Sequence, residues 1–174
     1  GAGIVVGNKA DLGRLRGVGV EVPMFDWAAW SAFVDGAENE EVDRLLDPES
    51  AAWLLFTSGT TAAPKGALLS HKGLLASVAA STAARPVSAD DVYVFPFPLC
   101  HVAGYNVIHR HAHGRPVVLM PGFAAAEFCE TVEREHVTST SLAATMLASL
   151  VELLEVEPGR VTQLRSLVSI AYGA

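Results

Sequence analysis

The sequence predicts an α/β fold in which a mostly parallel sheet is covered by helices. Strand-like apolar segments alternate along the chain with segments whose apolar residues have helical spacing. The strand-like segments are apolar on both faces, which is typical of strands buried in a parallel sheet. The 174 residues also suffice for one domain with a hydrophobic core.

Each element is predicted from its own residues. Asp26 is a candidate N-cap for one helix, and Ser70 or His71 opens another that stops before Pro86. The expected helices span residues 26–34, 38–46, 70–84, 104–113, 124–135 and 145–156. The expected strands span residues 4–6, 18–22, 51–56 (a buried strand), 92–97, 116–120, 137–141 and 167–171.

Composition excludes several classes of protein. The net charge of −7, with no basic stripe, argues against a nucleic-acid partner. No apolar run reaches the roughly 18 uninterrupted residues that a transmembrane helix needs, and we expect no secretory signal in the first residues. Cys100 and Cys129 lack metal-site spacing, so we expect reduced thiols in a cytoplasmic protein.

A loop rich in hydroxyl groups and glycine follows the apolar segment 51–56 and ends with a lysine. Hydroxyls and free backbone N–H groups suit phosphate oxygens, and Lys65 adds a positive charge for the outer phosphates. It is not a Walker A loop, because Gly66 and Ala67 follow Lys65 where that motif needs Ser or Thr. The alternative is an ordinary turn between two strands. The run is Thr57-Ser58-Gly59-Thr60-Thr61-Ala62-Ala63-Pro64-Lys65-Gly66.

This run resembles the phosphate-binding signature of the adenylate-forming superfamily, which includes acyl-CoA synthetases and the adenylation domains of peptide synthetases. It departs from the usual pattern at Ala62, where the family prefers glycine. Alanine there costs on the order of 1 kcal/mol if the loop needs a positive φ. The resemblance implies that Lys65 is catalytic and that the loop binds the phosphates of ATP, supplied with Mg²⁺. The implied phosphate-binding residues are Thr57, Ser58, Gly59, Thr60, Thr61 and Lys65.

A second motif follows the strand predicted over residues 92–97, at the edge of the sheet where α/β proteins bind ligands. Residues 97–106 resemble the superfamily motif whose histidine lines the acyl pocket beside the adenylate. The resemblance implies that His101 is a catalytic residue that forms part of the wall of the acyl pocket and acts as its gate. Cys100 replaces the bulky aromatic residue that is usual in the family. A histidine that only caps a helix is the alternative. The implied acyl and adenylate pocket consists of His101, Val102, Ala103, Gly104, Gly173 and Ala174, the last two from a turn at the end of the chain.

Three histidines, His109, His111 and His113, alternate with other residues. On a strand they would share one face and could bind a metal ion, whereas on a helix only His109 and His113 would meet. We favour a helix with a polar, partly exposed surface, and we predict no metal site.

The resemblance implies a division of the chain and a reaction. Residues 1–50 would form a partial upstream βα segment, and residues 51–174 an ATP- and acyl-binding subdomain from the large N-terminal domain of an acyl-CoA synthetase. The implied reaction activates a carboxylate, which we expect to be a fatty acid, to an acyl-adenylate and transfers the acyl group to coenzyme A. We expect residues 1–174 to be an inactive fragment by themselves. Loading of a carrier protein and a non-catalytic module are the alternatives, and the oligomeric state is left open.

Overall fold

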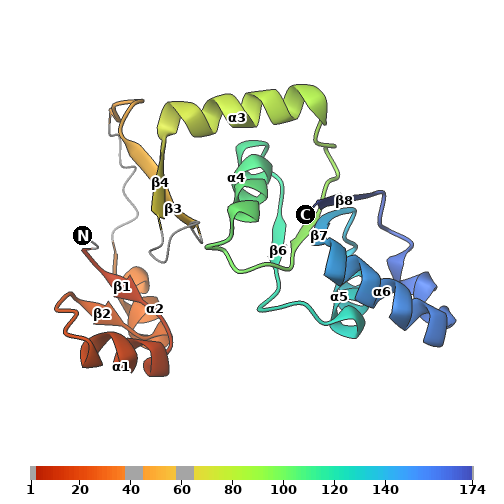
Figure 1. The fold of residues 1–174 in the computed structure, drawn as a ribbon, viewed down its shortest axis with the longest axis horizontal. Coiled ribbons are helices and arrows are strands. Elements are labelled where there is room, and N and C mark those ends of the chain that lie inside the picture. Colours follow the sequence, from red (N-terminus) through yellow and green to blue (C-terminus); the bar gives the residue numbers. More distant parts are fainter. Residues whose placement is uncertain (1–2, 38–44, 58–64, 174) are drawn as a thin grey trace. The chain divides into compact units, whose positions relative to one another are not determined.

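A computed structural model of the chain describes residues 3–37, 45–57 and 65–173 (Figure 1). The backbone divides into two compact units, Gly1–Leu45 and Leu46–Ala174. Each unit has its own sheet structure, so the two are described separately.

The first unit is a βαβα segment. Strands β1 (Val5–Val6) and β2 (Met24–Phe25) pair in parallel, and helix α1 (Lys9–Gly17) connects them. Helix α2 (Trp27–Asp35) follows, and the side chain of Asp26 caps it by accepting a hydrogen bond from the Ala29 N–H at 2.9 Å, as predicted.

The strand expected over residues 18–22 is wrong. The N–H groups of Val18, Gly19 and Val20 all bond back to carbonyls of helix α1, so they cannot join a sheet ladder. Gly19 also has φ of +79°, which ends the helix in a tight turn. Helix α1 was not predicted, and the helix expected over residues 38–46 falls largely outside the described residues.

The second unit opens with a hairpin and a long helix. Strands β3 (Ala51–Thr57) and β4 (Lys65–Ser70) pair antiparallel, and helix α3 (His71–Ala84) begins directly after them with Ser70 as its N-cap. The sequence predicted the strand β3 and missed β4. The expected burial of β3 is wrong, because β3 lies in a two-stranded sheet where Leu54 is 50% and Phe56 70% exposed.

Four parallel strands form the main sheet in the order β6-β5-β7-β8, which confirms the predicted α/β fold class. The strands are β5 (Tyr93–Phe95), β6 (Val117–Leu119), β7 (Ser139–Ala143) and β8 (Ser169–Gly173). The crossovers are α4 (Tyr105–Ala112), α5 (Ala125–Glu135) and α6 (Ala144–Val156), which is followed by a 3₁₀ segment, η2 (Pro158–Leu164).

The two faces of this sheet differ. Helices α5 and α6 cover one face, where Val94 and Leu142 pack in a core with Phe128, Val132 and Leu150 (Figure 1). Helix α4 contacts β5 and β6, and it lies over the other face, where the Arg110 guanidinium stacks 4.6 Å from the centre of the Tyr93 ring. No helix within the described ranges has the length and apolar character needed to cross a membrane.

Candidate active site

The strand order identifies the place where a ligand is expected. From β5 the chain crosses to β6 on one side and then returns to β7 on the other side of β5. Connections that leave in opposite directions open a crevice at the carboxyl ends of the two neighbouring strands. The candidate site is therefore the carboxyl edge between β5 and β7.

A cavity of about 610 Å³ lies at this edge. Its walls come from the loop after β5, the end of β7, the start of α6 and the end of β8. The predicted residues His101, Val102 and Ala103 all line it. The other lining residues are Phe97, Ser141, Leu142, Ala143, Ala144, Thr145, Ala171 and Tyr172, which are mostly apolar.

His101 has a fixed orientation in this wall. Its Nδ1 accepts a hydrogen bond from the Ala103 N–H at 3.1 Å, which caps the short 3₁₀ turn η1 (Val102–Gly104). The ring also stacks on Phe97, with 5.2 Å between ring centres and 10° between planes. Because Nδ1 is an acceptor, the neutral ring carries its proton on Nε2. His101 therefore caps a turn and also lines the cavity, and its role as a wall and gate of an acyl pocket stays a prediction.

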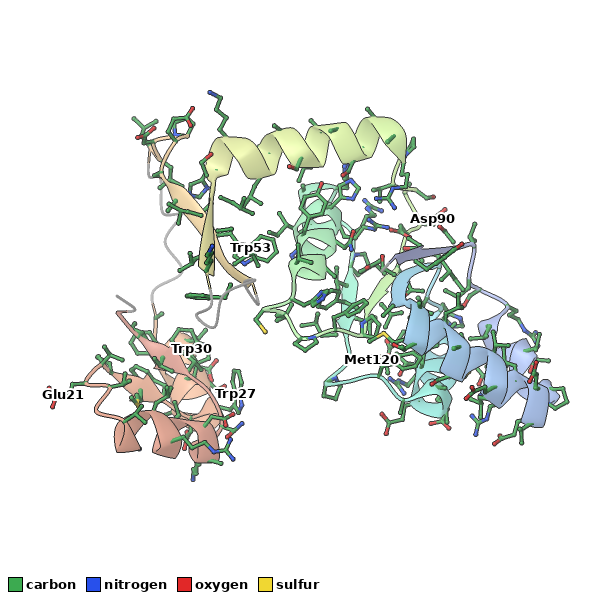
Figure 2. The ribbon with its side chains drawn as sticks, in the orientation of Figure 1. Glu21, Trp27, Trp30, Trp53, Asp90 and Met120 are labelled. Atoms are coloured by element: carbon green, nitrogen blue, oxygen red, sulfur yellow. The ribbon has the colours of Figure 1, made fainter. Side chains whose placement is uncertain are left out.

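Gly104 has a packing role and is not among the residues that line the cavity. A Cβ atom built on it would lie 2.7 Å from the Leu99 carbonyl oxygen and 3.5 Å from the Trp53 ring. Figure 2 shows Trp53 on the hairpin formed by β3 and β4. The absent side chain allows the start of α4 to pack closely against β3 and the loop that carries His101.

We expect Gly104→Ala to destabilise the second unit by about 1–3 kcal/mol, because a backbone carbonyl must move to make room. Urea unfolding measures this loss. Gly122→Ala is the matched control, since an added Cβ there meets nothing within 4 Å. Equal stability of the two variants would contradict the packing role.

The predicted phosphate loop is described only at its ends. Thr57 and Lys65 are paired opposite each other in the β3–β4 ladder, so the hairpin brings the first and last predicted phosphate ligands together. Ser58, Gly59, Thr60 and Thr61 lie outside the described residues.

Of the two pocket residues predicted at the end of the chain, the structure describes only Gly173. Gly173 is the last residue of β8 and pairs with Ala143 of β7, next to cavity residue Tyr172. Ala174 lies outside the described residues.

The three histidines lie on or next to helix α4, as favoured from sequence. His109 and His113 converge on the Thr82 hydroxyl of α3, at 3.2 and 2.7 Å from Nε2. The expected exposed surface is wrong for His109, which is only 2% exposed. Across the described ranges, no group of three or more His, Cys, Asp or Glu side chains is arranged to hold a metal ion.

A buried ion pair joins α4 to the amino ends of β5 and β7. Asp91 accepts hydrogen bonds from Arg110 Nε at 2.7 Å, the Ser139 hydroxyl at 2.6 Å and the Thr138 hydroxyl at 2.7 Å. Burial, the largest influence, raises the pKa of Asp91, but the two hydroxyls and the Arg110 charge outweigh it and the net pKa is lowered. This pair fixes α4 on the sheet, so it also positions the His101 loop at the other end of the helix. Sequence reasoning missed it.

His109 extends this network. Arg110 donates to its Nδ1 at 3.0 Å, which requires the proton on Nε2 and favours the neutral ring. Burial, and then the charges of Arg110 and His113, lower the pKa of His109 below 6.5. The folded state therefore disfavours the charged form of this histidine.

We expect the free energy of unfolding to fall as the pH drops from about 7 to about 5. The pKa of His109 is lower in the folded state than in the unfolded state, so the unfolded state binds the proton first as the pH falls. Protonation therefore stabilises the unfolded state. The stability that the neutral histidine contributes above its unfolded pKa is lost on acidification. The lowered pKa of Asp91 acts in the same direction below 3.8. Denaturant titrations at several pH values measure the slope. His109→Gln should flatten it and His111→Gln, an exposed control on the same helix, should not. A slope unchanged in His109→Gln would contradict the assignment.

Comparison with known proteins identifies the enzyme family of this chain. The sequence model of the family "AMP-binding enzyme" matches residues 8–174. This chain therefore belongs to the AMP-binding, or adenylate-forming, enzyme family, as its motifs indicated.

Individual relatives agree with this class. The chain is 30% identical over 119 residues to 2-succinylbenzoate–CoA ligase of Bacillus subtilis, covering 68% of this chain and 24% of the relative. It is 32% identical over 152 residues to 4-coumarate–CoA ligase-like 9 of Arabidopsis thaliana, covering 85% of this chain and 26% of the relative. The chain thus spans about a quarter of the length of these curated relatives.

Solved structures share the fold. O-succinylbenzoate Coenzyme A Synthetase from Bacillus subtilis in complex with AMP superposes with a TM-score of 0.79 at 25% identity, covering 100% of this chain and 43% of that one. The same synthetase in complex with ATP and a magnesium ion gives a TM-score of 0.73 at 26% identity, over 87% of this chain and 31% of that one.

Proposed function

We propose that the whole protein to which this chain corresponds is an AMP-forming carboxylate–CoA ligase. The observation that carries the proposal is the cavity at the carboxyl edge between β5 and β7, where His101, Val102 and Ala103 meet the end of β8. Family membership, with relatives and solved neighbours named as CoA ligases and synthetases, supports the reaction class. In this proposal residues 51–174 supply the ATP and acyl sites.

The first half-reaction joins the acid to ATP, bound as its Mg²⁺ complex. A carboxylate oxygen of the acid attacks the α-phosphorus, the bond to the bridging oxygen breaks, and pyrophosphate leaves. Lys65 and the hydroxyl-rich loop would stabilise the charge that builds on the pyrophosphate. The pairing of Thr57 with Lys65 in the hairpin supports a common ligand for both residues.

The acid would lie in the 610 Å³ cavity. His101, whose acceptor nitrogen is already engaged by Ala103, would present its Nε2–H to the carboxylate. Gly173 and Ala174 would lie beside the adenylate. In the second half-reaction the sulfur of coenzyme A attacks the acyl carbonyl, its thiol proton is lost, and AMP leaves.

The class of acid is a finer question. A fatty acid was expected from sequence, and the mostly apolar lining of the cavity suits an aliphatic or aryl body. The relatives above are named for succinylbenzoate and coumarate, so the fatty acid stays a prediction. The cytoplasmic location also stays a prediction.

The experiment uses the whole protein, ATP and Mg²⁺ with a panel of aliphatic and aryl acids, with and without coenzyme A. We expect acid-dependent formation of AMP and pyrophosphate and a thioester when coenzyme A is present. An acyl-adenylate that coenzyme A does not consume, but a phosphopantetheine carrier protein does, would move the proposal to carrier loading. Nucleotide binding without any turnover would support a non-catalytic module and contradict the proposal.

A further inference from the structure

Helices α3 and α4 are in contact (Figure 1), and they meet through polar side chains. Tyr105, the first residue of α4, donates a hydrogen bond from its hydroxyl to the Ser81 hydroxyl at 2.8 Å. His109 of α4 and His113, which follows its last turn, both place Nε2 against the Thr82 hydroxyl, at 3.2 and 2.7 Å. The contact between the two helices therefore depends on hydrogen bonds from histidines, the side chains whose charge changes most readily near neutral pH.

The two helices lead away from the two motifs of the candidate active site. Helix α3 begins directly after strand β4, whose first residue is Lys65. Helix α4 begins directly after the 3₁₀ turn that His101 caps. The start of α4 also packs on β3, where Gly104 lies against Trp53. The contact between α3 and α4 thus ties the segment that follows the predicted phosphate loop to the segment that follows the predicted acyl-pocket motif.

The Thr82 hydroxyl determines where the histidine protons lie. It donates its single hydrogen to the Val78 carbonyl at 2.9 Å, so its oxygen is the acceptor for both rings, and both Nε2 atoms carry a hydrogen. The other ring nitrogen of His109 accepts a hydrogen bond from Arg110 at 3.0 Å. This network therefore fits His109 only as the neutral ring, whereas His113 keeps its Nε2–H in either protonation state.

A proton added to His109 would break this arrangement. It would lie on Nδ1 and face the Arg110 Nη1–H, which is also a donor, and His109 is only 2% exposed. Burial, and then the charges of Arg110, His113 and Arg85, lower the pKa of His109, and Asp91 opposes them with a smaller effect. The charged and titratable groups around it are Arg110 and His113 from α4 and its end, Arg85 after α3, Asp90 and Asp91 before β5, and Tyr93 of β5 under Arg110.

We propose that Thr82, His109 and His113 form a pH-sensitive latch, which holds α4 and the His101 loop against α3 while His109 is neutral and releases them when it is protonated. The inference rests on the proposed ligase function and adds positioning residues and a means of regulation to the same site. Asp91 holds Arg110 at 2.7 Å, so the charged ring is the group that moves, and Thr82 loses a donor. The His101 loop then loses the helix that supports it, and the acid binds less well.

The first test is the pH profile of acid-dependent pyrophosphate release by the whole protein. We expect kcat/KM for the acid to fall roughly four- to thirtyfold between pH 8 and pH 5, as one group with a pKa below 6.5 is protonated. The change should appear mainly in KM for the acid. At saturating acid, kcat/KM for ATP should change less, because Lys65 lies on β4 and not on α4.

Variants assign this fall to the latch. His109→Gln cannot take up a proton, so its ratio of kcat/KM at pH 8 to that at pH 5 should be smaller than in the unsubstituted protein by about threefold or more. Thr82→Val removes the acceptor and should lower kcat/KM for the acid already at pH 8, whereas Thr82→Ser keeps the hydroxyl and should not. His111→Gln, at an exposed position on the same helix, is the control and should keep the full pH profile. An unchanged ratio in His109→Gln would overturn the inference.

Hydrogen exchange tests the latch without any turnover. Mass spectrometry of the whole protein at pH 8 and pH 5, corrected for the intrinsic exchange rate at each pH, compares residues 105–112 of α4 with residues 125–135 of α5. Helix α4 should lose protection at pH 5 in the unsubstituted protein and in His111→Gln but not in His109→Gln, and α5 should stay protected in all three. Equal protection of α4 at both pH values in the unsubstituted protein would overturn the inference. Equal loss of protection in α4 and α5 would also overturn it, because the protein would then unfold as a whole.

The outcomes separate this inference from the proposed function. No pyrophosphate release with any acid at any pH would mean that the ligase proposal fails, and the exchange measurement would then decide on the latch alone. Release whose pH profile is the same in His109→Gln and in the unsubstituted protein would mean that the reaction stands and the latch does not.

Discussion

Replacing Lys65 with alanine is expected to lower kcat/KM for ATP by about two to three orders of magnitude in the whole protein. Lys65 is the first residue of β4 and pairs with Thr57 at the end of the predicted phosphate loop. In the proposed mechanism a preorganised cation at this position would stabilise the charge that develops on pyrophosphate, and such a donor is typically worth about 3–4 kcal/mol in the transition state.

Steady-state pyrophosphate release over a range of ATP concentrations measures this effect. Lys72→Ala is the matched control, because Lys72 is an exposed lysine near the start of α3 whose partner is Glu49, at 2.6 Å. Its loss should leave kcat/KM close to the unsubstituted value. If both variants kept the same kcat/KM for ATP, Lys65 would have no part in the mechanism.

Replacing Asp91 with alanine is expected to cost about 3–5 kcal/mol of the free energy of unfolding of the second unit. The change leaves the largely buried Arg110 without its carboxylate, and it removes the acceptor for the Ser139 and Thr138 hydroxyls. Because Arg110 lies on α4, the His101 loop should also become less well positioned.

Urea unfolding of Asp91→Ala measures the loss, and Asp90→Ala, at the exposed neighbouring carboxylate, is the control. The double variant Asp91→Ala with Arg110→Met should recover much of the stability, since it removes the uncompensated buried charge. A cost below about 1 kcal/mol for Asp91→Ala would show that the pair is solvated and does not hold α4 in place.

The histidine motif predicted which residues lie together better than local patterns predicted which strands pair. His101, Val102 and Ala103 were taken from a contiguous motif, and the structure places all three on one cavity wall. Helix α3 was also recognised, because Ser70 supplies a local capping signal and Pro86 a local stop signal. Local signals of this kind need no knowledge of distant residues.

The features that sequence reasoning missed depend on distant partners. Strand β4 exists because residues 65–70 pair with residues 51–57, and no pattern within 65–70 shows that pairing. Asp91 and Arg110 lie in different parts of the fold, so their positions in the sequence do not show that they form a buried ion pair. The burial of His109 follows from the packing of α4 on α3, which a helical periodicity alone does not specify.

The most direct test of the account is ATP–pyrophosphate exchange by the whole protein without coenzyme A. An acyl-adenylate forms reversibly, so we predict exchange of labelled pyrophosphate into ATP that requires both Mg²⁺ and the acid and is strongly reduced in Lys65→Ala. Hydrolysis of ATP to ADP and phosphate, without acid-dependent exchange, would contradict the central claim that this site adenylates a carboxylate.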